Sequence, residues 1–105
     1  MIPRQSMILE AQLAFVRSAQ PNLTQRQLAI LMCVGWRGPQ YVWRLAEELK
    51  VTRPVITRAV TSLAQLGFVR RQSVREDRRQ CLVAATDEGR AYLERYSASG
   101  LFGGA

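Results

Sequence analysis

The chain has 105 residues, of which 48% are hydrophobic and 22% are charged, and its formal net charge at pH 7 is +7. This length and composition are typical of one soluble globular domain with a single core. The sequence contains no histidine, and it has none of the common hydrolase, nucleotide-binding or zinc-protease motifs. We therefore expect no enzyme, no catalytic residues, no metal site and no cofactor.

The longest apolar run, Leu28–Trp36, covers nine residues, well short of the roughly 20 that a membrane-spanning helix needs. Near the N-terminus, Glu10 and Gln12 interrupt any apolar stretch that could serve as a signal peptide. These features predict a cytoplasmic protein without a membrane partner.

The first predicted helix covers residues 4–19. Ile8, Ala11 and Phe15 recur at helical spacing, with further apolar residues beside them, so the apolar stripe is wide. One small domain cannot cover such a stripe completely, which favours a dimer interface. Pro21 and Asn22 then end the helical pattern.

The second predicted helix begins at a capping-box pattern, Thr24 followed three residues later by Gln27, and runs to about Trp36. Glycines and Pro39 then end the helical pattern. A third, short helix covers residues 42–50. Its inward face is predicted to consist of Leu45, Ala46 and Leu49.

The fourth helix follows Thr52, a good N-cap residue, and has Pro54 in its first turn, where the missing N–H costs nothing. It is predicted to end at Leu66, before Gly67. Successive residues are 100° apart around a helix, which separates two faces. The predicted inward face is Val55, Ile56, Ala59, Val60, Leu63 and Leu66. The predicted outward face has no acidic residue and consists of Pro54, Thr57, Arg58, Thr61 and Gln65.

After Gly67 the pattern changes to two strands, 68–73 and 80–85, joined by a charged hairpin tip at residues 74–79. Thr86 then caps a last helix that runs to about Tyr96. We expect a mainly α fold with a small β-wing, that is, a winged helix-turn-helix of about five helices and a two-stranded antiparallel hairpin. The whole chain, 1–105, forms one domain in this interpretation, with a flexible tail at 97–105.

Basic residues are concentrated in one stretch. Residues 50–79 carry eight of the fifteen basic side chains and two of the eight acidic ones, for a net charge of +6. Arg70 and Arg71 extend this positive surface from the helix toward the hairpin. Such a concentration is typical of a surface that binds a polyanion, and a helix beside an arginine-tipped hairpin favours duplex DNA.

In this order and spacing, several segments closely resemble the MarR family of transcriptional regulators. They are LAEELKVTRPVITRAVTSL, the GFVRR junction, Asp77-Arg78-Arg79 and Thr86-Asp87-Glu88-Gly89-Arg90. The resemblance covers about residues 23–92. It implies a sequence-specific regulator that binds a palindromic duplex DNA site as a homodimer, with segments 4–19 and 87–98 forming the dimer.

The resemblance also implies roles for individual residues. The helix 53–66 would be the recognition helix, and the residues facing the major groove or its phosphates would be Thr52, Arg53, Pro54, Thr57, Arg58 and Thr61. In the wing, Arg79 would enter the minor groove, braced by Asp77. The remaining DNA-binding arginines of the wing are predicted to be Arg70, Arg75 and Arg78. A small aromatic effector is a further partner that the family implies.

Some residues admit two interpretations. Cys33 and Cys81 are interpreted as small core residues, with oxidant sensing as the alternative. Core packing is favoured over ligand binding for Trp36, Tyr41 and Trp43. For the whole chain, the alternatives are a winged helix that binds another protein and an architectural protein that binds DNA without sequence preference.

Overall fold

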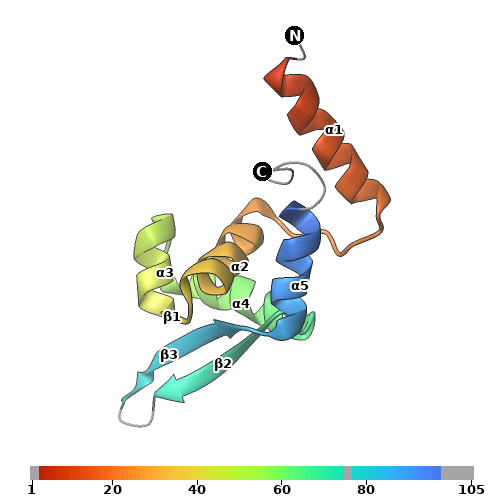
Figure 1. Ribbon diagram of the computed structural model, residues 1–105. Coiled ribbons are helices and arrows are strands. Elements are labelled where there is room, and N and C mark those ends of the chain that lie inside the picture. Colours follow the sequence, from red (N-terminus) through yellow and green to blue (C-terminus); the bar gives the residue numbers. More distant parts are fainter. Residues whose placement is uncertain (1–2, 75–76, 98–105) are drawn as a thin grey trace.

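The computed structural model describes residues 3–74 and 77–97, with the side chains of residues 74 and 77–79 outside that description. The elements in chain order are α1 (Arg4–Arg17), α2 (Gln25–Arg37), β1 (Gln40–Tyr41), α3 (Val42–Leu49), α4 (Arg53–Gln65), β2 (Val69–Val74), β3 (Asp77–Ala85) and α5 (Asp87–Tyr96). Figure 1 shows α2–α5 as one body, from which the β2–β3 hairpin projects as a wing. The predicted winged helix-turn-helix fold is confirmed.

The sheet has one strand more than the sequence predicted. Its order is β1-β3-β2, with both pairs antiparallel. The extra strand, Gln40–Tyr41, pairs with Val83 and Leu82 of β3. Two residues are too few to show the alternation by which a strand is recognised, so the pairing with β3 alone makes this segment a strand.

The predicted hairpin tip, 74–79, is shorter in the structure. β2 continues to Val74 and β3 begins at Asp77, with a register irregularity between Ser73 and Val74. The charged residues of the tip gave no strand signal in the sequence, because β-propensity reflects cross-strand packing more than an intrinsic preference of the backbone.

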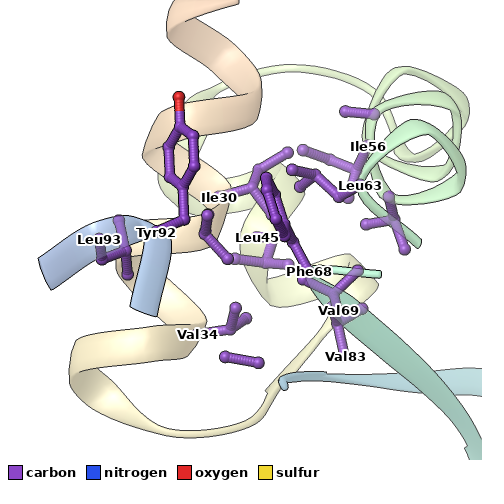
Figure 2. Close-up of a cluster of buried hydrophobic side chains, with 14 of the residues drawn as sticks. Ile30, Val34, Leu45, Ile56, Leu63, Phe68, Val69, Val83, Tyr92 and Leu93 are labelled. Carbon is purple, nitrogen blue, oxygen red and sulfur yellow. The ribbon is translucent and has the colours of Figure 1, made fainter. Parts of the chain in front are cut away.

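The core lies between α2, α4, α5 and the inner face of the sheet (Figure 2). Ile30 and Val34 of α2 contribute to it, together with Ile56 and Leu63 of α4 and Val83 of β3, and all five are buried. Figure 2 shows Tyr92 and Leu93 entering the same cluster from α5. This core fixes α4 against the sheet and leaves its opposite side at the surface.

Capping residues that the sequence predicted hold the ends of these helices. Thr24 and Gln27 form the reciprocal capping box at the start of α2. At the end of α4, Gly67 adopts φ +80°, and its N–H and that of Phe68 donate to the carbonyls of Ala64 and Leu63. This Schellman motif turns the chain directly from α4 into β2. α4 and the wing are therefore joined by a fixed corner.

α1 is attached differently from the other helices. In Figure 1 it extends away from the body, and only its C-terminal half approaches α5. Phe15 packs edge-to-face on Tyr92 and Tyr96, with ring centroids 5.4 and 5.1 Å apart. Gln12 Nε2 also donates to the Tyr96 hydroxyl at 3.2 Å. Most other apolar side chains of α1 are exposed, as the wide stripe in its sequence predicted.

Three expectations about buried residues were wrong in part. Leu66 was assigned to the inward face of α4 but is 42% exposed, because the chain has begun to turn away at that position. Trp36 is 57% exposed, although Tyr41 and Trp43 are half-buried and stack on each other. Cys33 and Cys81 are free thiols that are only half-buried.

Cys33 packs against the core, and burial raises the pKa of its thiol, with nearby Arg37 opposing that shift. A raised pKa keeps the thiol protonated, which favours the packing interpretation of Cys33 over oxidant sensing. The predicted tail lies outside the described residues except for Ser97, whose hydroxyl donates to the Leu93 carbonyl at 3.0 Å.

Candidate nucleic-acid interface

The outward side of α4 is the centre of the candidate interface. Ile56, Ala59, Val60 and Leu63 anchor the other side of the helix in the core. The separation into two faces that the sequence predicted is therefore confirmed, apart from Leu66 and Val55. Val55 is half-buried and lines a surface depression together with Arg58. Thr52 is the N-cap residue, although its side chain makes no capping hydrogen bond. Its hydroxyl therefore remains available to another partner.

Six side chains of α4 line a shallow depression of about 600 Å³ that runs along the outward face. They are Arg53, Pro54, Thr57, Arg58, Thr61 and Ser62. With Thr52 immediately before them, they include all six residues that the family resemblance places toward the major groove. None of the lining residues is acidic, so the depression has the electrostatic character that a phosphate-bearing ligand requires.

Arg58 also borders a second depression, of about 250 Å³, between α4 and the first turn of α2. Thr24, Arg26 and Gln27 form the α2 side of this depression. Arg26 was not among the predicted site residues. The capping box at Thr24 is the signal that could have found it, because it places Arg26 in the first turn of a helix, where unpaired N–H groups favour anions.

The two neighbouring arginines of β2 have different environments. Arg71 Nη1 donates to Thr61 Oγ1 at 3.2 Å, so its side chain reaches the outward face of α4. Arg70 lies one residue earlier and lines a depression with Asp87, Glu88 and Arg90. Successive residues of a strand point to opposite faces, which accounts for this difference. Of the two, only Arg70 was predicted as a site residue, yet Arg71 is the one that contacts α4.

The remaining predicted residues belong to the wing. Asp77, Arg78 and Arg79 lie in β3, and their side chains are outside the described part of the structure. Arg75 lies outside the described residues altogether. The structure therefore gives the path of the wing backbone and leaves the suggested contact between Arg79 and Asp77 as a prediction.

Ion pairs lie elsewhere on the molecule. Within the described residues, Arg37 pairs with Glu48 and Arg90 pairs with Asp87, each at 2.7 Å. The hydrogen bond from the Arg37 guanidinium lowers the pKa of the Glu48 carboxyl. Neither pair includes an arginine from the outward face of α4, and no carboxylate neutralises that face in the described structure.

Neither a metal-binding cluster nor a membrane-spanning helix occurs among the described residues. No cluster of three or more His, Cys, Asp or Glu residues in these ranges could hold a metal ion. Among the same residues, no helix is both long enough and apolar enough to cross a bilayer.

A helix-turn-helix with a projecting hairpin and an arginine-bearing outward helix defines the winged-helix class of regulators. The family model for the MarR family matches residues 23–81. The chain therefore belongs to the MarR family, whose members are transcriptional regulators and not enzymes.

Known proteins agree with this assignment. The chain is 36% identical over 83 residues to the uncharacterised HTH-type transcriptional regulator ML2140 of Mycobacterium leprae. The aligned region covers 79% of this chain and 57% of that protein. The crystal structure of YusO from Bacillus subtilis is similar with a TM-score of 0.74 at 25% identity, covering 90% of this chain and 65% of that one.

A second similar structure is NadR in complex with 4-hydroxyphenylacetate, with a TM-score of 0.72 at 23% identity over 91% of this chain and 66% of that one. At that identity the likeness shows the fold alone. The chain spans 41–57% of the length of the first two curated relatives that it matches.

Proposed function

We propose that the protein binds a roughly palindromic duplex DNA site as a homodimer and thereby regulates transcription. The observation that carries this proposal is the outward face of α4, which presents Arg53 and Arg58 and which Arg71 reaches at Thr61. None of these three arginines has an acidic ion-pair partner in the described structure. Uncompensated positive charges repel one another, and a polyanion relieves this repulsion.

In this proposal α4 enters the major groove, which is about 12 Å wide and admits one helix. Arg58 is the residue best suited to read a base, because a guanidinium donates two parallel hydrogen bonds to O6 and N7 of guanine. Arg53 and Thr52 at the start of α4, together with Arg26 at the start of α2, would bind the flanking phosphates. These contacts would supply affinity, and Arg58 would supply sequence preference.

The wing would bind beside the groove that α4 occupies. We assign Arg79 to the minor groove, where narrow A·T tracts concentrate negative potential, and Asp77 to the support of Arg79. Arg75 and Arg78 would add contacts to phosphates, whereas Arg70, which lies beside Asp87 and Glu88 on the other face of β2, would contribute less. The strands support this arrangement, since the fixed corner at Gly67 joins the wing directly to α4.

The exposed apolar residues of α1 support the homodimer. Met7, Ile8, Leu9 and Val16 are between 45% and 62% exposed. Leu9 and Val16 lie on one side of the helix and Met7 lies on another side. Exposed apolar residues that cover so much of a helix are typical of an interface between proteins. A second copy that packs against α1 and α5 would place two α4 helices on one duplex, about 34–36 Å apart for successive major grooves.

We extend the proposal to a small aromatic effector. The complex of NadR with 4-hydroxyphenylacetate shows that a protein of this fold can hold such a molecule. In this chain, a depression of about 320 Å³ between α2, β1 and α3 offers Tyr41 for a ring and Arg44 for a carboxylate. Arg37 lines the same depression but is paired with Glu48. Titration of the protein–DNA complex with 4-hydroxyphenylacetate tests this extension, and release of the DNA supports it.

One experiment tests the proposed function as a whole. The protein selects duplexes from a random pool, and native mass spectrometry gives the stoichiometry of the recovered complex. A palindromic consensus bound by two chains supports the proposal. Binding without a consensus indicates the architectural alternative, and absence of binding at low salt indicates a protein-interaction module.

A further inference from the structure

The hydroxyl of Thr61 makes two hydrogen bonds whose directions are fixed by chemistry. It lies 2.9 Å from the Thr57 carbonyl oxygen and 3.2 Å from Arg71 Nη1. A carbonyl can only accept and a guanidinium can only donate. Thr61 therefore donates its single hydrogen to Thr57 and accepts from Arg71.

This arrangement changes what Thr61 can offer to a ligand. Its only donor is occupied within α4, so it cannot donate to a phosphate or a base without breaking that bond. One acceptor lone pair and a methyl group remain. The sequence-based hypothesis that Thr61 reads DNA directly would thus have to rest on its methyl group or on this one lone pair.

Arg71, unlike Thr61, keeps hydrogen-bond donors that a ligand could use. In β2 it pairs with Val83, which is fully buried, and it follows the buried Val69 by two residues on the same face of the strand. Its side chain extends from that face to α4, where its guanidinium donates a hydrogen bond to Thr61. A guanidinium has five N–H donors, and this bond uses one of them. Neither ion pair among the described residues includes Arg71.

We propose that Arg71 binds a DNA phosphate at the edge of the groove that α4 enters, and that Thr61 is a positioning residue that holds Arg71 there. This inference rests on the proposed DNA binding. A strand that flanks the recognition helix lies over the wall of the groove, where the phosphates are, and not over its floor. The bond between Thr61 and Arg71 then fixes the spacing between the helix contacts and the wing contacts.

Two substitutions of Thr61 separate this role from a methyl contact to a thymine, and the double-mutant comparison below separates it from base reading through the hydroxyl oxygen. Thr61→Val keeps the branched shape and the methyl group but removes the acceptor. Thr61→Ser keeps the hydroxyl but removes the methyl group. If Thr61 positions Arg71, the valine variant binds DNA more weakly and the serine variant binds as the parent does. If the Thr61 methyl meets a thymine, the two variants show the reverse pattern.

Arg71→Gln tests the phosphate interaction itself, with Arg70→Gln as the matched control on the other face of the same strand. The full-length chain is titrated onto its selected duplex over a series of salt concentrations. We expect Arg71→Gln to reduce the slope of log K against log [salt] by about one for each phosphate that the variant no longer neutralises. Arg70→Gln should change the slope less.

A double-mutant comparison completes the test. Adding Thr61→Val to Arg71→Gln should cause little further weakening of DNA binding, because the hydroxyl acts only through the arginine. Circular dichroism and melting temperature verify the fold of each variant, and Arg71→Met, which keeps the apolar stem, replaces Arg71→Gln if the glutamine variant is unfolded.

Additive effects of the two substitutions, or equal slopes for Arg70→Gln and Arg71→Gln, would overturn the inference while leaving the proposed function intact. A parent chain that binds no duplex in a salt-dependent way would instead overturn the proposed function.

Discussion

Two surfaces of the molecule differ sharply in their chemistry, and each lacks a partner within the described structure. The outward face of α4, with Arg71 beside it, is basic and free of acidic residues. The exposed side of α1 is apolar and includes Leu9 and Val16. The first surface is suited to a polyanion and the second to another apolar surface. Binding at the two surfaces should therefore depend on different variables. Binding at the basic face should depend on ionic strength, and binding at the apolar side of α1 should depend on the apolar residues that it buries.

Salt should produce the largest difference between the two surfaces. If six to ten phosphates are neutralised, affinity for the selected duplex should fall by about 10³–10⁵ between 50 and 200 mM salt. Self-association through α1 should change little over the same range, because apolar burial is not screened. Fluorescence anisotropy measures the first quantity, and sedimentation velocity without DNA measures the second. A salt-independent affinity for DNA would show that the basic face does not bind phosphates.

Charged substitutions in α1 should have the next largest effect. Leu9 and Val16 lie seven residues apart, on one side of the helix. We expect the double variant Leu9→Glu with Val16→Glu to be monomeric and to lose binding to a palindrome while keeping weak binding to a half-site. Ala14→Glu, which places a charge elsewhere on α1, is the control. A double variant that remains dimeric would show that the interface lies elsewhere.

Arg58→Ala should weaken binding to the selected duplex by about 1–3 kcal/mol, the typical contribution of a bidentate base contact. Binding to a scrambled duplex should change much less, because nonspecific binding depends on phosphates. Arg37→Ala is the control, because it also removes one positive charge, from a side chain that pairs with Glu48. It should weaken binding to both duplexes slightly and equally. Equal weakening on the two duplexes for Arg58→Ala would show that it does not read a base.

The smallest effect is expected at the wing. Arg79→Ala should lower affinity with little change in melting temperature, and the decrease should be greater on a duplex with A·T-rich flanks than on one with G·C-rich flanks. Asp77→Ala should cause a smaller decrease of the same kind if this carboxylate holds Arg79. Tighter binding to unrelated duplexes would instead indicate that Asp77 only repels phosphate. Unchanged binding of Arg79→Ala to both duplexes would exclude the wing as a reader of DNA.

The sequence by itself determined the elements whose signals are local. The capping box of Thr24 and Gln27 predicted the start of α2 because both partners lie within one helical turn. The inward and outward faces of α4 followed from its period, and the stop at Gly67 from the backbone conformation that glycine permits. Pro54, Thr57, Arg58 and Thr61 could be assigned to the outward face in the same way, whereas Thr52 and Arg53 were added by the family resemblance.

Features that depend on contacts between distant parts of the chain could not be predicted from the sequence, because tertiary packing sets them. β1 is a strand only because β3 lies beside it, 43 residues after Gln40 in the pair with Val83. Trp36 belongs to an apolar run of α2 but is 57% exposed, because packing against the rest of the domain decides which side of the helix is covered. Arg70 and Arg71 are neighbours of the same residue type. In the folded chain, the register of β2 against β3 and the position of α4 direct Arg71 to Thr61 and Arg70 toward Asp87. The strand alternation is a local property, but which face of the strand meets α4 is set by the packing of the whole domain.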